Sequence, residues 1–177
     1  MEFCLSGFPE SIRKQAEQLE EERRDLNRKL LYELRRGKLQ RGTWVQWFNT
    51  GDLFNEMSGK VLGSFCSYLR HQGFVNPNKY LVGFMNIPRH VPGLGELSVD
   101  YTRLSARTGI KLERQVREGR YPPLSSLIAE ACEALGGFGD GYSVAASWII
   151  PTGAELGFIA KFEELVSKYM RVDLAAG

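Results

Sequence analysis

Two groups of residues in this sequence have types and spacings that suit a negatively charged oxygen. The first is a glycine run in LGGFGDGYSVAASWIIP, residues 135–151, where Gly136, Gly137, Gly139 and Gly141 fall within six residues. Glycine lacks a Cβ, so successive backbone N–H groups can line a concave phosphate site. The alternative is structural: Gly136 ends the preceding helix in a left-handed cap, and the other glycines form a turn. The spacing leaves both interpretations open.

The second group is a serine flanked by two arginines. Arg103 and Arg107 lie two residues on either side of Ser105, so in a strand all three side chains point to one face. A face that presents guanidinium, hydroxyl and guanidinium is costly to bury and well suited to phosphate. The alternative is a solvent-exposed strand face with surface ion pairs.

The sequence predicts no catalytic centre in this chain. Its two histidines, His71 and His90, stand apart, the aspartates are scattered, and no DxD, HxH, HExxH or GxSxG grouping occurs. A two-metal phosphoesterase needs several Asp and His ligands at one point. The three cysteines, Cys4, Cys66 and Cys132, are widely spaced and form no CxxC pair, which predicts reduced thiols and no structural zinc.

Length and composition indicate a globular protein. The 177 residues suit one domain with an appended element, and a net charge of +2 neither demands nor excludes nucleic acid. No apolar run approaches the roughly 18 residues of a membrane span, and the N-terminus lacks a signal-peptide pattern. We therefore expect a cytoplasmic protein that has no contact with a membrane.

A long helix is expected to position the rest of the chain. After a short lead segment, residues 1–8, Pro9 can begin a helix that Gly37 ends, and residues 10–36 contain no Gly or Pro. This charged connecting helix, 9–37, could pack on the domain, pair with a second copy or bridge to another domain. Its apolar stripe consists of Ile12, Ala16, Leu19, Leu26, Leu30 and Leu34.

From residue 42 onward, helical and extended patterns follow one another in the order βαββααβα. This order predicts an α/β fold in which helices pack on a mixed sheet. The expected strands are 44–48, 80–87, 96–106 and 143–150, and the expected helices are 58–72, 110–119, 124–135 and 152–171.

Several of these segments resemble one protein family. TRLSAR (102–107), then a helix, then GGFGDGYSVAASWIIP (136–151) and FIAKFEEL (158–165) resemble the DHH-associated domain of archaeal-type RecJ-like single-strand nucleases in the DHH phosphoesterase superfamily. That domain has a serine-x-arginine strand, a helix and a GGGH-x-x-AAG loop. SGKVLGSFCSYLRHQGFVNPNKYLVGF (58–84) and LEEERRDLNRK (19–29) are similar to the family's middle segment and tethering helix.

The resemblance implies that residues 42–171 form a substrate-binding domain for single-stranded DNA or RNA. The family's phosphate-contacting arginine and serine fall on Arg107 and Ser105. The family's loop histidine is Tyr142 here, which can hydrogen-bond or stack on a base, and Ser147 replaces the glycine after the two alanines. The nucleic-acid-binding residues expected are Arg103, Ser105, Arg107, Gly136, Gly137, Gly139, Gly141 and Tyr142.

The family's metal-binding catalytic half, which would bind Mn or Mg, has no counterpart in this sequence. The resemblance therefore implies a binding module without a cofactor of its own, acting beside a separate DHH catalytic half. One alternative is a nuclease-inactive replication scaffold that associates with GINS, as some archaeal RecJ-like members do. Another is a small enzyme with an unrecognised site. A homodimer formed through the N-terminal helix is a further expectation.

Overall fold

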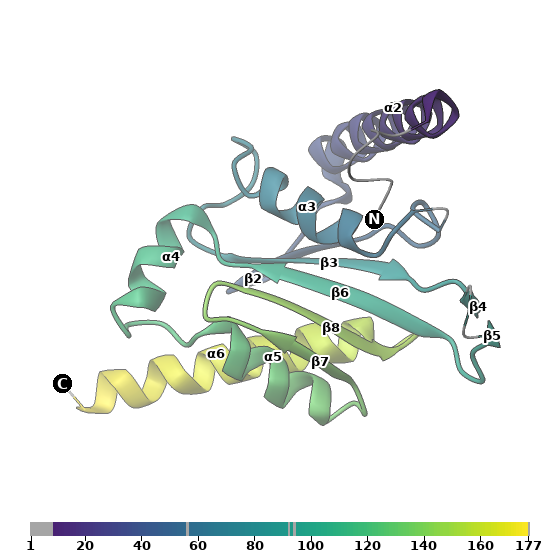
Figure 1. The fold of residues 1–177 in the computed structure, drawn as a ribbon. Helices are drawn as coiled ribbons and strands as arrows, with labels where there is room; N and C mark the ends of the chain where they lie inside the picture. The colour runs from purple at the N-terminus through teal and green to yellow at the C-terminus, as the bar shows by residue number, and fades with distance from the viewer. Residues whose placement is uncertain (1–8, 56, 92, 94, 177) are drawn as a thin grey trace.

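A six-stranded sheet with helices on both faces makes up the body of this computed structural model (Figure 1), which describes residues 9–55, 57–91, 93 and 95–176. The strand order is β1-β2-β3-β6-β8-β7. The strands are β1 (Gln40–Arg41), β2 (Val45–Asn49), β3 (Tyr80–Asn86), β6 (Tyr101–Arg107), β7 (Phe138–Gly141) and β8 (Ala145–Pro151). The helices are α2 (Glu10–Glu33), α3 (Lys60–Leu69), α4 (Ile110–Arg117), α5 (Leu124–Glu133) and α6 (Glu155–Ala176).

The sheet is mixed, which confirms the predicted α/β fold. Strands β2 and β3 run parallel and are joined through α3, whereas the other neighbouring pairs are antiparallel. A parallel pair needs a crossover connection, which a helix commonly supplies. Strand β3 is buried on both faces, as expected for a central strand that has helices above and below it.

Two hydrophobic cores lie on opposite faces of the sheet. Helices α5 and α6 cover one face, where Phe84 packs edge-on against Phe158. Helix α3 and the end of α2 cover the other, where Phe48 meets Phe65. A Cβ on Gly83 of β3 would lie 2.6 Å from Phe48 Cζ, so the glycine allows α3 to approach the sheet closely. Burial of such aromatic side chains contributes about 1.5–3 kcal/mol each.

The long N-terminal helix is present, and only its second half packs on the body. Leu30 and Leu34 are buried, whereas Leu19 is 54% exposed, and the first half extends past α3 (Figure 1). Helix α2 continues into a wider turn, η1 (Leu34–Lys38), in which Gly37 has φ +116°, so the predicted stop at Gly37 is confirmed. None of the helices in the described ranges has the length and apolar content that crossing a bilayer requires.

Two sequence expectations about strands were wrong. The strand expected at 96–106 begins at Tyr101, because its partner β8 ends at Pro151 opposite that residue. Residues Gly95–Glu96 instead form β5, which pairs with β4 (His90–Val91) in a separate ribbon. Residues 138–141, expected to lie in a turn or loop, form the edge strand β7, which pairs with β8.

Candidate functional site

The serine and the two arginines share one face of β6, as their spacing predicts. Their neighbours Leu104 and Ala106 are buried in the core beneath the sheet, so the triad faces α3. The contacts with α3 agree: a Cβ on Gly63 would lie 3.1 Å from Arg107 Nη2 and 3.4 Å from Ser105 Oγ.

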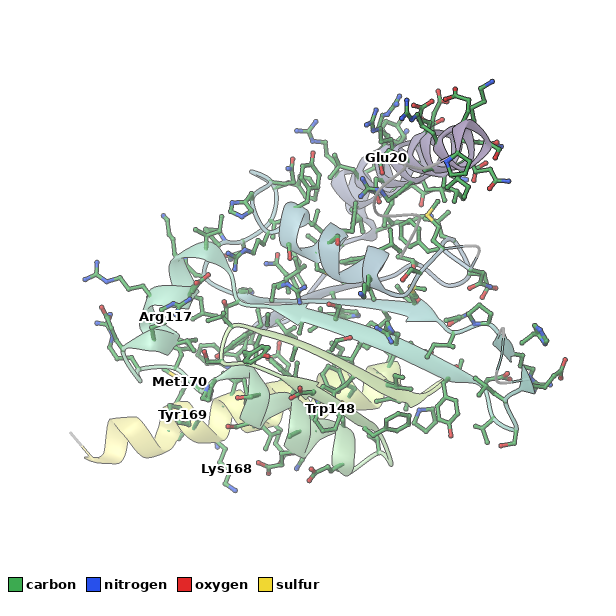
Figure 2. All side chains as sticks on the ribbon, viewed as in Figure 1. Glu20, Arg117, Trp148, Lys168, Tyr169 and Met170 are labelled. Atoms are coloured by element: carbon green, nitrogen blue, oxygen red, sulfur yellow. The ribbon has the colours of Figure 1, made fainter. Side chains whose placement is uncertain are left out.

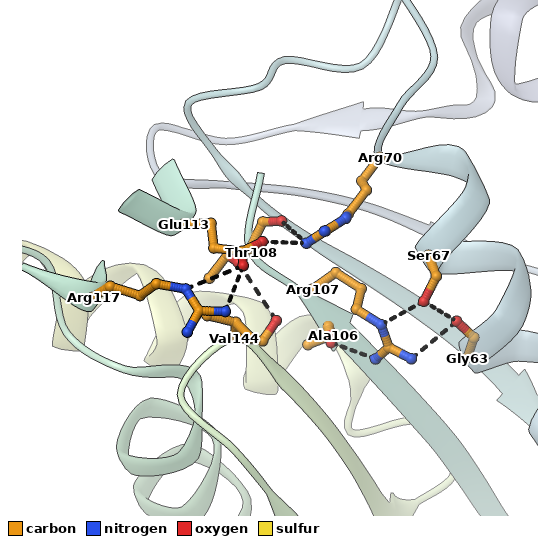
Figure 3. Close-up of polar contacts among 9 residues, drawn as sticks. All are labelled: Gly63, Ser67, Arg70, Ala106, Arg107, Thr108, Glu113, Arg117 and Val144. Carbon is orange, nitrogen blue, oxygen red and sulfur yellow. Dashed lines mark hydrogen bonds and ion pairs between the residues drawn. The ribbon is translucent and has the colours of Figure 1, made fainter. Parts of the chain in front are cut away.

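Arg107 is held by neutral oxygen atoms (Figure 3). Its guanidinium donates to Ser67 Oγ at 2.9 Å, Gly63 O at 3.0 Å, Ser105 Oγ at 3.1 Å and Ala106 O at 2.7 Å. Burial lowers the pKa of Arg107 because it disfavours the charged form, yet a guanidinium stays protonated at neutral pH. The side chain is therefore a fixed cation whose four acceptors carry no negative charge.

A hollow of about 280 Å³ opens beside Arg107, between α3 and strands β6 and β8. We call it the serine–arginine hollow. Three cationic residues, Lys60, Arg103 and Arg107, line it together with serine hydroxyls, and no Asp or Glu is among its lining residues. Its lining consists of Gly59, Lys60, Gly63, Ser64, Ser67, Arg103, Ser105, Arg107 and Ser147.

The N-terminus of α3 borders the hollow. A Cβ on Gly59, the residue before α3, would lie 2.9 Å from Arg103 Nε, so this glycine lets Arg103 lie against the start of the helix. The first turn of a helix carries partial positive charge. Binding of an anion such as phosphate is therefore favoured here by the start of the helix, by Lys60 and by the two arginines.

The face that carries the triad continues across β8 and β7, beyond α3. In register, Ser105 pairs with Ser147, which pairs with Asp140. Tyr142 follows β7 and is 76% exposed, while Phe138 at the other end of β7 is 56% exposed. Directly opposed residues of antiparallel strands share a face. We call the following residues the open face: Phe138, Asp140, Tyr142, Ala145, Ser147 and Ile149.

The start of the glycine run is a helix cap, as the structural interpretation predicted. Gly136 has φ +72°, and its N–H donates to Glu133 O at 3.1 Å. The N–H of Gly137 donates to Cys132 O at 2.8 Å, which completes a Schellman motif at the end of α5. These two amides are therefore already engaged within the chain.

The remaining glycines allow close packing of β7 on β8. A Cβ on Gly139 would lie 2.6 Å from Ser147 O and from Trp148 Cα, and one on Gly141 would lie 2.4 Å from Ala146 Cβ. Trp148 lies on the side of the sheet where α5 and α6 lie (Figure 2). Any larger residue at 139 or 141 would push β7 away from its partner.

The expected single pocket of arginine and glycine amides is not formed. Strand β7 is two strands away from β6, which is about 10 Å at the usual strand spacing. The Arg107 guanidinium points instead toward α3 (Figure 3). The structure thus brings together Arg103, Ser105 and Arg107, and it puts the glycine run at the far edge of the same sheet.

Sequence reasoning missed Lys60, Ser67 and Phe138. Phe138 carried a signal, because it alternates with the glycines of β7 and so faces the side opposite to theirs. Lys60 and Ser67 reach the hollow only because α3 crosses over β6. No local pattern marks such residues.

A second polar cluster joins α3 to α4 near the end of β6 (Figure 3). Arg70 donates to Glu113 Oε2 at 2.9 Å and to Thr108 O at 3.3 Å, and Arg117 donates to Glu113 Oε1 at 2.7 Å. These hydrogen bonds, that of Arg117 foremost, lower the pKa of Glu113. Each charge here has an opposite partner, so the cluster holds α4 in place.

The buried thiols are not reactive centres. Burial raises the pKa of Cys66 and of Cys132 to about 12, so both stay protonated and poorly nucleophilic at neutral pH. Within the described ranges, no three His, Cys, Asp or Glu side chains gather in a way that could hold a metal ion.

Comparison with known proteins adds a weak structural likeness. No protein-family model matches the chain, and no curated protein matches it. Among solved structures, it is similar to the C-Ala domain of alanyl-tRNA synthetase from Aquifex aeolicus, with a TM-score of 0.44 and 14% sequence identity. The match covers 75% of this chain and 97% of that domain.

Proposed function

We propose that this chain binds single-stranded nucleic acid along the open face, with a backbone phosphate in the serine–arginine hollow. The observation that carries the proposal is the half-buried Arg107 guanidinium, held by neutral acceptors and accompanied by Lys60 and Arg103. A phosphodiester brings one negative charge. Four of the five N–H groups of Arg107 already donate within the chain, so Arg107 supplies its charge and one further hydrogen bond, while the guanidinium of Arg103 can donate two. The hydroxyl of Ser64 is a further donor in the same hollow, whereas that of Ser147 already donates to Leu104 O at 3.2 Å.

Exposed aromatic side chains support a single strand as the ligand. Tyr142 follows the end of β7 and lies four positions after Phe138, which is about 13 Å of extended chain. Bases of a single strand can stack on such rings, and each stacked base contributes about 1–3 kcal/mol. Bases in a duplex are already stacked on one another, so their faces are not available to these rings.

The experiment is a salt-titrated fluorescence anisotropy measurement with labelled single-stranded DNA and RNA. We expect affinity to fall with added salt. We expect Tyr142→Ala to weaken binding by about 5- to 150-fold, as the loss of about 1–3 kcal/mol from one stacked base implies, and Arg103→Ala to weaken binding and to reduce its salt dependence, because a phosphate contact is lost. Arg114→Ala is the matched control, because Arg114 is 83% exposed on α4 and pairs only with a neighbouring glutamate.

Arg107→Ala belongs in the same series, with thermal denaturation beside it because Arg107 also joins β6 to α3. No measurable binding at low salt would refute the proposal. So would parent-like binding by both Arg103→Ala and Tyr142→Ala.

A finer proposal rests on the sequence resemblance: the chain is the substrate-binding part of a RecJ-like DHH phosphoesterase and acts beside a separate catalytic half that binds Mn or Mg. Restoration of metal-dependent cleavage of single strands by adding a DHH half would support it. Association with GINS subunits, and pairing of two copies through α2, remain predictions. On α2, Ile12, Leu19 and Tyr32 are exposed apolar residues that can make such contacts.

A further inference from the structure

A second basic surface lies on the side of α3 that faces α2. Between the two helices runs a groove of about 320 Å³, which we call the α2–α3 groove. Helix α2 provides one wall and α3 the other, and the lining residues are Arg23, Arg24, Asn27, Arg28, Leu31, Ser64, Phe65 and Tyr68. No Asp or Glu is among its lining residues.

Arg23 is held by Glu20 at 2.6 Å, but the other two arginines of the groove, Arg24 and Arg28, are available for an external anion. Arg24 and Arg28 side chains are 66% and 75% exposed. Arg24 pairs with Glu20 at 3.3 Å, and Arg28 pairs with Asp25 at 3.1 Å, both within α2. Exposed pairs one helical turn apart stabilise by only about 0.3–0.5 kcal/mol, so a phosphate can replace the carboxylate at little cost.

The groove also offers contacts for a base. Tyr68 is 53% exposed and contacts the buried Phe65, with ring centroids 6.5 Å apart, so part of its ring surface is open to a base.

The groove and the serine–arginine hollow meet on the crest of α3. Ser64 lines both of them. Its neighbours toward the hollow, Gly63 and Ser67, are also small, so no large side chain separates the two. A strand that leaves the hollow can therefore cross α3 over Ser64 and enter the groove, which is about one helix diameter or 10 Å away.

We propose that the α2–α3 groove is a second subsite that binds the next nucleotides of the same single strand. Arg24 and Arg28 hold a backbone phosphate, and Tyr68 stacks on a base. The inference rests on the function proposed above and extends it, because it predicts a footprint that runs across the sheet and over α3.

Oligothymidylates of increasing length test the subsite. Anisotropy is measured for the parent, for Tyr68→Ala and for the double variant Arg24→Gln/Arg28→Gln, with a 5-mer and a 16-mer. We expect both variants to bind the 16-mer about 10-fold more weakly than the parent and to bind the 5-mer equally well. Tyr68→Phe should retain parent affinity, because it keeps the ring. Arg13→Gln/Lys14→Gln is the control, with the same charge change on α2 outside the groove-lining residues.

The possible failures are distinguishable. If the parent binds neither the 5-mer nor the 16-mer, both the function proposed above and this inference are refuted. If Arg103→Ala weakens binding at both lengths while the groove variants match the parent at both, phosphate binding in the serine–arginine hollow is supported and the subsite in the α2–α3 groove is refuted. An equal loss for the control and groove double variants would also refute the groove, because only net charge would then matter.

Discussion

Arg107 is held by hydroxyl and carbonyl oxygens, and this has consequences for anion binding. When a guanidinium pairs with a carboxylate, that pair must be broken before the guanidinium can bind a phosphate. The acceptors of Arg107 are uncharged, so its positive charge is not neutralised, although its position is already fixed. Binding to such a side chain avoids the roughly 0.5–1.5 kcal/mol that ordering a mobile side chain costs. By contrast, Arg70 is neutralised by Glu113, and so we assign it a structural role.

Asp140 is the acidic residue that most affects the open face. It is exposed, pairs in register with Ser147, and accepts a hydrogen bond from the Gly141 N–H at 2.6 Å. We expect Asp140→Asn to bind single strands about 2- to 5-fold more tightly at low salt, because it removes repulsion of the phosphates and keeps an oxygen for Gly141.

The measurement is anisotropy at two salt concentrations, and the gain should shrink at high salt. Glu130→Gln, on α5 against the other face of the sheet, controls for net charge. Weaker binding by Asp140→Asn would show that this carboxylate accepts hydrogen bonds from the ligand.

At the scale of the element, strand β7 can pack closely on β8 because its glycines have no side chain. It is a four-residue edge strand packed against β8, and glycine at alternate positions lets it lie over Trp148. Glycine weakens a strand through its conformational freedom. The close packing of β7 on β8 compensates for this loss. Phe138 then lies on the opposite side of the sheet, on the open face.

Gly139→Ala should therefore destabilise the chain by about 1–3 kcal/mol, because the new Cβ would clash with backbone atoms that cannot rotate away. Gly136→Ala should cost about 1 kcal/mol, since its φ of +72° is strained for alanine. Urea unfolding measures both. Gly73→Ala is the control, because a Cβ there meets nothing within 4 Å; a loss as large as that at Gly139 would contradict the packing argument.

The contact between α3 and α4 depends on Glu113. Its carboxylate, 22% exposed, receives hydrogen bonds from Arg117 and Arg70, and Glu113→Gln should lower the free energy of unfolding by about 1 kcal/mol at pH 7. The native-state pKa of Glu113 is lowered, so its contribution is present above the unfolded value of about 4.3 and is lost as the pH falls through the native value.

Urea unfolding at pH 7 and pH 3 measures this difference, which should shrink at the lower pH. Glu118→Gln, at the more exposed pair with Arg114, should change stability by less than about 0.5 kcal/mol. A parent and Glu113→Gln that are equally stable at pH 7 would contradict this role for the carboxylate.

At the scale of the whole molecule, one sheet separates two cores, and each core contains a buried thiol. Cys66 lies on the buried side of α3, and Cys132 lies on the buried side of α5 against the opposite face of the sheet. The two thiols therefore report separately on whether the two sides of the sheet open together. In a single cooperative domain both become accessible at the same denaturant concentration.

In a Cys4→Ser background, we expect neither thiol to react with a disulfide reagent at pH 8 in the native state and both to react together across the urea transition. Because burial raises the pKa of both thiols to about 12, stability should fall as the pH rises above the unfolded thiol value of about 8.5. Mass spectrometry of the labelled chain identifies each site. Labelling of Cys132 at lower urea than Cys66 would show that the α5–α6 side opens first.

Local rules of the chain sufficed for several features. Gly37 and Gly136 end helices because only glycine adopts their left-handed backbone conformation without strain. The two-residue period set the common face of Arg103, Ser105 and Arg107, and alternating helical and extended patterns predicted the α/β class. Each depends on residues close together in the sequence, so the residue types alone contain the information.

Tertiary structure decided the rest, because it depends on contacts between distant segments. Gly139 lies in a strand and not in a phosphate loop because Trp148 and Ser147 lie directly against it. Lys60 joins the arginines because α3 crosses β6. The separation of the glycine run from Arg107 follows from the insertion of β8 between them. Strand order is set by the burial of apolar surface over the whole chain, which no local spacing encodes.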